Sequence, residues 1–490
     1  MSVSEASSRK WLILAVVTLA AFVSNVDATI VVIGLPHLMS GLHTSVTLGL
    51  WTLTAYIITS TVFLLPAGRW TDVAGPKRVF IGGLTVFALA TAACGAATSG
   101  PMLVALRFVQ GGGASLCLAS GTPIIVATFP REQLGRALGV NSTAWVMGSI
   151  VGPVAGGALV GTLGWRSIFY VTVPFVLLAI VGGVAVLPAG VRRGARVPTD
   201  WAGVLSSGLA LVALLVALSE GPGWGWGSWR IVGLLGAAAA LFAAFVVVEQ
   251  RVDEPLFDLH LFRHVHFRAG VSVVVCYAIG FFATTFLLTF YLQGALHMSP
   301  LDAGLALVPL SAPQLVLSPL GGGLADRLGP ARLVVAGVCL LVASAFLLGR
   351  LGVTFSAVAV VVPLLMMSAA NALAWPALTK AVMSSVPRAQ SGVAAGTFYA
   401  LRNVGMSLSL TLALVVAESS LPRSIASQVF VGTAHVLSQR DAAALVHATD
   451  NGFTVFVAFY AAALLLALGL FRRVRERPVP VPDGVEEAAV

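Results

Sequence analysis

Three charged residues, Asp27, Arg107 and Arg402, lie deep inside long apolar stretches of the sequence. An ionised side chain is costly inside a membrane and usually marks a functional site. At about 1.5 Å per helical residue, Asp27 lies roughly 13 Å before Pro36 and Arg107 roughly 9 Å after Pro101, which are similar depths. Burial favours the neutral form of a carboxylic acid, whereas a nearby arginine favours the carboxylate. We therefore predict that Asp27 and Arg107 couple to protons; the alternative is a static ion pair that ties two helices together.

Polar and aromatic side chains recur at helical spacing within the same apolar stretches, a pattern typical of a lined cavity. Asn141 shares a helix face with Trp145, and Arg402 shares one with Tyr399. The predicted cavity-lining residues are Asn25, Tyr56, Gln110, Asn141, Trp145, Tyr399 and Arg402. An alternative stays open, because polar residues between membrane helices also serve as packing contacts. Arg402 in particular either orients backbone carbonyls or meets an anionic group of a substrate.

The composition indicates which elements position these residues. Of the 490 residues, 58% are hydrophobic and 10% are charged, whereas about 25% of the residues of a soluble domain are charged. The mean hydropathy is +0.97. These polar residues are too few to cover a water-soluble fold, which excludes a soluble enzyme, a disordered regulator and a nucleic-acid binder. The sequence therefore predicts an all-α polytopic membrane protein.

Apolar runs of about 20 residues, the length that crosses a bilayer as a helix, occur about fourteen times between residues 11 and 471. Most of the 28 lysines and arginines lie in every second loop between these runs. Because basic loops stay on the cytoplasmic side, both termini are expected in the cytoplasm. The net charge of +9 is therefore a topology signal in a multi-pass protein of the cell (plasma) membrane, and nucleic acid is not an expected partner.

Two segments of the sequence occur twice. Residues 68–78 align with 322–332 at an offset of 254, and residues 130–139 align with 387–396 at an offset of 257. The repeat pairs the second apolar run with the tenth and the fifth with the thirteenth, which is a shift of eight helices. Parallel repeats of this kind are how secondary transporters build two halves around a site near the membrane midplane.

This shift predicts two six-helix bundles with two helices inserted between them. The predicted units are an N-terminal bundle over 1–190, an inserted helix pair over 191–262, a C-terminal bundle over 263–475 and a cytoplasmic tail over 476–490. The segment 420–452, which leads into the last apolar run, is long for this chain, and no function can be read from it.

The motifs in these runs resemble those of the major facilitator superfamily, specifically its fourteen-span drug:proton antiporters. The resemblance covers essentially the whole chain. The first run carries an acidic motif around Asp27, and the fourth carries Arg107 followed by Gln110. The fifth run matches the family's antiporter motif completely, and the motif residues are Gly148, Gly152, Pro153, Gly156 and Gly157.

The two repeated loops are similar to the family's loop motif. The first copy departs from the pattern at Trp70, Val73 and Pro76, whereas the second keeps Asp326-Arg327. The loop residues expected to gate the transporter are Gly68, Asp72, Gly75, Lys77, Arg78, Gly322, Asp326, Arg327 and Gly329. An aspartate here can cap a helix amino terminus, and a glycine permits the tight turn. The resemblance implies that these loops latch an outward-open state, while the glycines of the fifth run seal a packed seam.

The resemblance implies a proton-coupled secondary active exporter, an antiporter that moves small molecules by alternating access. Expected substrates are small amphipathic or cationic compounds such as drugs, antibiotics or secondary metabolites; the other expected partners are protons and the lipid bilayer. No cofactor and no metal is expected, because the proton gradient drives transport, and the chain is expected to be a monomer. The sequence has no Gly-rich phosphate loop and no His–Glu zinc motif, so an enzyme is not predicted.

Two other functions stay open on the sequence. One is a dedicated exporter of a single metabolite, and the other is a lipid-handling or sensor membrane protein of the same fold that lacks coupling. The single intramembrane aspartate also fits sodium as the coupling ion.

Overall fold

The computed structural model describes residues 3–188, 200–252, 259–296, 298, 300–352, 356–420 and 439–474, and these ranges contain helices and no strand. The first half contains α1 (Val3–Gly41), α2 (Val46–Val62), α3 (Leu64–Ala74), α4 (Pro76–Gly95), α5 (Gly100–Thr128), α6 (Arg131–Leu163), α7 (Ser167–Tyr170) and α8 (Val173–Val186). α9 (Trp201–Trp224) and α10 (Trp229–Glu249) follow. The second half contains η1 (Leu259–Arg263), α11 (Val265–Thr289), η2 (Phe290–Ala295), α12 (Pro300–Ser311), α13 (Gln314–Leu328), α14 (Pro330–Leu348), α15 (Ala357–Ser384), η3 (Arg388–Gln390), α16 (Ser391–Ser420) and α18 (Gln439–Val474).

The number of membrane-spanning helices is slightly lower than predicted. Within the described ranges, twelve helices are long and apolar enough to cross a membrane, and the bent pair α2–α3 raises the number to thirteen. The all-α polytopic fold is thus confirmed, and the predicted number of about fourteen spans is slightly more than the number that meets this test in the described ranges. The apolar run over 391–417 forms α16, which is not in this set and carries Arg402 and Asn403. α16 packs against helices of both halves, and Asn403 is buried.

The second predicted run is bent because of Pro66. α2 and α3 meet at an angle of 44°. Proline lacks the N–H of a helical hydrogen bond, and its ring clashes with the carbonyl four residues earlier, which here is Val62, the last residue of α2. α3, which carries Gly68 and Asp72, then packs against α16 of the second half.

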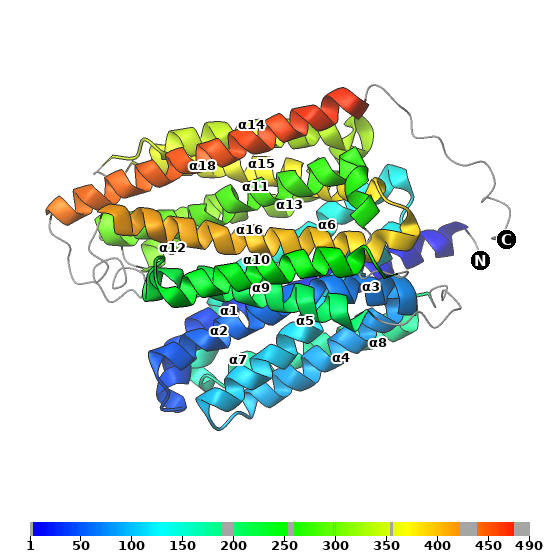
Figure 1. The fold of residues 1–490 in the computed structure, drawn as a ribbon, viewed down its shortest axis with the longest axis horizontal. Coiled ribbons are helices and arrows are strands. Elements are labelled where there is room, and N and C mark those ends of the chain that lie inside the picture. The colour runs from blue at the N-terminus through cyan, green and yellow to red at the C-terminus, as the bar shows by residue number, and fades with distance from the viewer. Residues whose placement is uncertain are drawn as a thin grey trace.

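The helices form two groups that correspond to the two halves of the chain (Figure 1). α1 to α5, α7 and α8 lie on one side, and α11 to α18, drawn in green to red, lie on the other. α6 is seen among the second-half helices, in agreement with its packing against α13. α9 packs against α10 and also against α2 and α16, so the inserted pair touches both halves. α1 begins and α18 ends at the same end of the molecule. We call this end, near Val3 and Val474, the base.

One predicted unit boundary falls within a short 3-10 helix, and the others lie outside the described residues. The boundary at 262–263 lies within η1, while the boundary at 190–191 and the tail over 476–490 are outside the described ranges. Of the segment 420–452, residues 421–438 are also outside them, and residues 439–452 belong to α18.

Near the base the two halves meet through glycine backbones. A Cβ atom added at Gly68 on α3 would lie 2.5 Å from the carbonyl oxygen of Gly392 on α16. A Cβ atom added at Gly135 on α6 would lie 2.4 Å from the carbonyl oxygen of Gly322 on α13. No side chain fits at such distances, so glycine is required at both contacts. We call these two contacts, formed by the four glycines, the glycine crossings.

Candidate functional site

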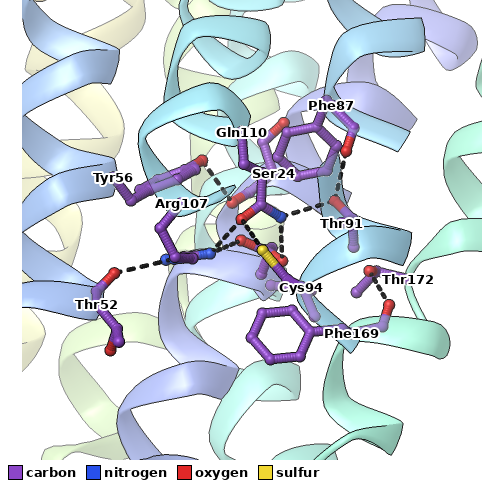
Figure 2. Close-up of polar contacts among 12 residues, drawn as sticks. Ser24, Thr52, Tyr56, Phe87, Thr91, Cys94, Arg107, Gln110, Phe169 and Thr172 are labelled. Atoms are coloured by element: carbon purple, nitrogen blue, oxygen red, sulfur yellow. Dashed lines mark hydrogen bonds and ion pairs between the residues drawn. The ribbon is translucent and has the colours of Figure 1, made fainter. Parts of the chain in front are cut away.

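A buried ion pair joins α1 and α5. Nη1 of Arg107 lies 2.6 Å from Oδ2 of Asp27, and the side chains are 1% and 0% exposed (Figure 2). Nε of Arg107 donates a hydrogen bond of 3.0 Å to the backbone oxygen of Thr52 on α2. A buried charge pair is stable only when its other polar atoms are also satisfied. The two residues predicted to couple to protons are therefore in direct contact, and their role in coupling stays a prediction.

Gln110 completes this network from the next turn of α5. Its Oε1 accepts a hydrogen bond of 2.6 Å from Nη1 of Arg107. Its Nε2 donates to Oδ1 of Asp27 at 2.9 Å and to Oγ1 of Thr91 at 2.7 Å (Figure 2). Both carboxylate oxygens of Asp27 thus accept a hydrogen bond. Gln110, which we expected to line a cavity, is instead fully buried here, because the helix face it shares with Arg107 points toward α1 and α4.

Tyr56 on α2 touches both the ion pair and a cavity. Its ring centroid lies 4.3 Å from Cζ of Arg107, which is a cation–π contact. Its hydroxyl donates a hydrogen bond of 3.5 Å to the backbone oxygen of Ser24. Tyr56 and Ser24 line the smaller of the two cavities described below, whereas neither Asp27 nor Arg107 reaches its wall. Tyr56 is therefore a direct connection between the ion pair and the cavity.

Two adjoining cavities lie between the halves. The smaller, of about 350 Å³, is lined mainly by first-half helices together with α11 and α16. The larger, of about 840 Å³, is lined by α6, by Asn25 on α1 and by second-half helices. The residues that line both cavities are Asn25, Trp145, Ser149, Phe282 and Arg402. The predicted cavity residues that line the smaller one are Asn25, Tyr56, Asn141, Trp145, Tyr399 and Arg402.

Arg402 on α16 is surrounded by aromatic rings where the two cavities adjoin. Its Cζ atom lies 4.9 Å from the ring centroids of Trp145 and Phe282 and 5.6 Å from that of Trp375. Its Nη1 donates a hydrogen bond of 3.3 Å to the side-chain oxygen of Asn403. Among the residues that the structure describes, no carboxylate forms an ion pair with Arg402, and no backbone carbonyl accepts a hydrogen bond from it.

Three polar residues of the second half were missed by the sequence analysis. The hydroxyl of Tyr277 donates to Oδ1 of Asn371, and Nδ2 of Asn371 donates to Oε1 of Gln314. All three line the larger cavity. Each lies inside an apolar run, so the rule that singled out Arg402 also applies to them. Elsewhere in the described ranges, no group of three or more His, Cys, Asp or Glu side chains is placed to hold a metal ion.

The two repeated loop aspartates bind helix backbones of the opposite half. Asp72 on α3 accepts hydrogen bonds of 2.7 and 2.9 Å from the N–H groups of Gly392 and Val393, at the start of α16. Asp326 on α13 accepts bonds of the same lengths from the N–H groups of Gly135 and the next residue, in the second turn of α6. Negative charge is favoured near a helix amino terminus. The sequence predicted capping aspartates, but it did not predict that the capped helices belong to the other half.

Asp326 has a second, charged partner. Nζ of Lys380 on α15 lies 2.5 Å from Oδ1 of Asp326, and Lys380 is only 8% exposed. Lys380 directly follows an apolar run in the sequence, a position that predicts a basic loop residue. The structure instead places it within α15, where its stem is buried and its ammonium group neutralises Asp326.

The other loop residues mainly shape the turns. Gly75 and Gly329 adopt φ angles of 92° and 86°, in the left-handed region that favours glycine. Lys77 donates hydrogen bonds to two backbone oxygens at the end of α8, at 2.9 and 2.6 Å. Arg78 and Arg327 are exposed.

The antiporter motif on α6 packs against α1 through two of its glycines. A Cβ atom added at Gly148 would lie 2.8 Å from Cβ of Asn25, and one added at Gly152 would lie 2.0 Å from Oγ1 of Thr29. Thr29 also donates a hydrogen bond of 3.1 Å to the backbone oxygen of Gly148. These contacts hold α6 close to the helix that carries Asp27.

The rest of the motif has different surroundings. Gly156 is buried, and its spacing places it on the same face of α6 as the two packed glycines. Pro153 lines the larger cavity. A Cβ atom added at Gly157 would meet nothing within 4 Å. The motif thus combines helix packing with a cavity wall, and Gly157 belongs to neither.

Comparison with known proteins identifies related transporters. The profile of the Major Facilitator Superfamily matches residues 17–410. The chain is 31% identical over 444 residues to the tetracenomycin C resistance and export protein of Streptomyces glaucescens, covering 91% of this chain and 82% of that protein. It is 33% identical over 466 residues to the puromycin resistance protein pur8 of Streptomyces alboniger, covering 94% and 90%. It is 27% identical over 413 residues to the multidrug transporter protein MdtP of Bacillus subtilis, covering 84% and 76%.

Solved structures share the fold. The human organic anion transporter MFSD10 superposes with a TM-score of 0.64 at 16% identity, covering 94% of this chain and 99% of that one. The proton:xylose symporter XylE, bound to 6-bromo-6-deoxy-D-glucose, superposes with a TM-score of 0.62 at 16% identity, covering 96% of each chain. At this level of identity the similarity concerns the fold alone.

Proposed function

The chain belongs to the Major Facilitator Superfamily, and on that basis we propose that it is a proton-coupled exporter of small amphipathic molecules. Relatives named for tetracenomycin C export, puromycin resistance and multidrug transport support export. The observation that carries the coupling is the buried pair of Asp27 and Arg107, next to two cavities between the halves.

Protonation of Asp27 would disrupt this pair. With Asp27 ionised, its two oxygens accept hydrogen bonds from Arg107 and Gln110. A proton on Asp27 would remove its charge and leave Arg107 buried without a counter-ion, which is strongly unfavourable. Arg107 must then find new partners, which requires α1 and α5 to move relative to each other. Proton binding is in this way linked to helix movement.

The same movement would reach the cavities by two routes. Tyr56 contacts Arg107 and lines the smaller cavity. Asn25, which is two residues from Asp27 on α1, lines both cavities and donates a hydrogen bond to the backbone oxygen of Trp145. A change of partner at Asp27 therefore changes the wall on which a substrate binds.

The closed base corresponds to one of the two states that an alternating-access cycle requires. The glycine crossings and the caps at Asp72 and Asp326 hold the two halves together near the base. If the base faces the cytoplasm, as the basic loops predict, this conformation faces outward. The larger cavity extends away from the base, past Pro153 on α6 and Leu305 near the start of α12. Inward opening then requires both caps to break.

Reconstituted liposomes test this function directly. The full chain would be given puromycin and tetracenomycin C, the compounds in the relatives' names, with ΔpH and ΔNa⁺ imposed separately. We expect drug movement that follows ΔpH and proton flux in the opposite direction. Asp27→Asn should abolish the response to ΔpH while leaving exchange down a drug gradient.

The control is Asp302→Asn, which removes an exposed carboxylate at the start of α12. This variant should keep the ΔpH response. Unchanged coupling in Asp27→Asn would disprove the assigned proton site, and a response to ΔNa⁺ alone would replace protons with sodium. Transport of one compound in a broad panel would indicate a dedicated exporter, and the absence of any flux would favour a sensor or lipid-handling protein.

A further inference from the structure

We infer that the cavities select substrates with a flat aromatic ring system that carries an anionic oxygen, such as a carboxylate, phenolate or enolate, and that Arg402 binds this oxygen. This inference rests on the proposed function and specifies its substrate class. It differs from the cationic substrates that the sequence analysis expected.

The charge on the walls of the two cavities is positive and favours an anionic substrate. Among the described residues that line the two cavities, Arg402 is the one charged side chain, and no aspartate or glutamate is present. The nearby carboxylate of Asp27 is fully buried, and its charge is neutralised by Arg107. A cationic substrate would therefore meet a positive wall with no counter-charge, whereas an anion would meet its complement.

Most hydrogen-bond donors of Arg402 have no acceptor among the described residues. Its guanidinium group carries several N–H donors in a fixed fork that matches an anionic oxygen pair. Only one described group accepts from it, the side-chain oxygen of Asn403 at 3.3 Å. The alternative that Arg402 serves to orient backbone carbonyls has no support in the described residues. Its remaining donors are available where the two cavities adjoin.

The aromatic rings around Arg402 favour a flat aromatic substrate. Trp145 comes from the first half, and Phe282 and Trp375 come from the second, so the guanidinium lies among rings from both halves. Their contacts with Arg402 partly compensate for its missing counter-ion. The same rings offer stacking surfaces to a flat substrate next to the charge. Charge and ring planes together favour an aromatic anion over an aliphatic one.

An anionic substrate also changes how the membrane potential acts. An exported anion and an imported proton carry charge in the same direction across the membrane, whereas an exported cation offsets an imported proton. Each elementary charge moved across 100 mV contributes about 2.3 kcal/mol. With one proton per substrate, an inside-negative potential should therefore accelerate export of a monoanion and leave export of a monocation nearly unchanged.

Two dyes of opposite charge test the inference. Fluorescein, an anion, and rhodamine 123, a cation, share a three-ring xanthene core. Equilibrium binding of each dye to the purified full chain would be measured for wild type, Arg402→Gln, Arg402→Lys and Arg230→Gln. Arg230 is the matched control. Its Cζ atom lies 5.4 and 5.7 Å from the ring centroids of Trp224 and Trp229, but Arg230 lines neither cavity.

We expect wild type to bind fluorescein more tightly than rhodamine 123. Arg402→Gln should weaken fluorescein binding about 10- to 100-fold, the usual effect of losing a charge-assisted contact. It should leave rhodamine 123 binding unchanged or tighter. Arg402→Lys should retain part of the fluorescein affinity, and Arg230→Gln should behave as wild type. A thermal unfolding curve for each variant shows whether it is folded.

Other outcomes would overturn the inference. Tighter binding of rhodamine 123 by wild type would return the substrate class to cations. Equal weakening of both dyes by Arg402→Gln would reduce Arg402 to a packing residue. Either result leaves the proposed function intact if ΔpH still drives rhodamine 123 efflux. Selective fluorescein binding without any ΔpH-driven flux would instead contradict the proposed function. The inference that the cavities select aromatic anions would still hold.

Discussion

Asp326 accepts a hydrogen bond of 2.7 Å from the backbone N–H of Gly135, although the two residues belong to different halves of the chain. The repeat partners of these residues, Asp72 and Gly392, are joined by a bond of the same length. The base is therefore closed by two equivalent contacts, each made by an aspartate of one half and a helix of the other.

We predict that Asp326→Asn opens the base. The variant loses the carboxylate charge and leaves Lys380 buried without its partner, so the closed state should lose roughly 1–3 kcal/mol. Distances between spin labels on α6 and α13, measured by pulsed electron resonance, would report the opening. Adding Lys380→Met should restore part of the closed population, since it removes the unpaired charge. Identical distances in wild type and Asp326→Asn would contradict the prediction.

A single methyl group should have a similar effect at the glycine crossings. In Gly322→Ala the new Cβ atom would lie 2.0 Å from the backbone oxygen of Gly135, so α6 and α13 must move apart. Overpacking of this kind costs about 1–3 kcal/mol. Gly323→Ala is the matched control, because a Cβ atom there meets nothing within 4 Å. We expect slower transport and a wider base in the first variant only, and equal transport rates would argue against the role of the crossing.

Substitutions of Tyr56 separate its ring from its hydroxyl. Tyr56→Phe keeps the ring over Arg107 and loses a long hydrogen bond of 3.5 Å, so coupling should persist. Tyr56→Leu loses the cation–π contact, worth about 2 kcal/mol or more when desolvated, and should weaken coupling. The measurement is the ratio of proton uptake to drug efflux in liposomes. If Phe and Leu lower that ratio equally, the hydroxyl and not the ring is the connection.

Helix depth and helix face within one half could be predicted from the sequence. The rise of a helix is constant, so the depths of Asp27 and Arg107 followed from their distance to Pro36 and Pro101. Arg107 and Gln110 are three residues apart in the sequence, so they share a helix face, as the structure shows. Which neighbour that face meets depends on helix packing, and for this reason Gln110 lies in the ion-pair network instead of a cavity wall.

Contacts between the halves could not be predicted in this way. The repeat shows that residues 68–78 and 322–332 are equivalent, but it does not show what either segment touches. The caps at Asp72 and Asp326 depend on how the bundles dock. The pairing of Lys380 with Asp326 lies within the second half and depends on how α13 packs against α15. The same holds for the chain of Tyr277, Asn371 and Gln314, which joins three helices of the second half and of which only the polar residue types were visible in the sequence.

The exchange of caps between the halves makes this contact isologous, like the interface of a two-fold symmetric dimer. Each half presents the same donor and acceptor surfaces, so the chain closes its base as two subunits of a homodimer would, with α9 and α10 between them. Fusion into one chain frees the two copies to differ. Lys380 is such a difference, because α5, the first-half equivalent of α15, contains no lysine, and its pairing with Asp326 allows one cap to be strengthened without altering the other.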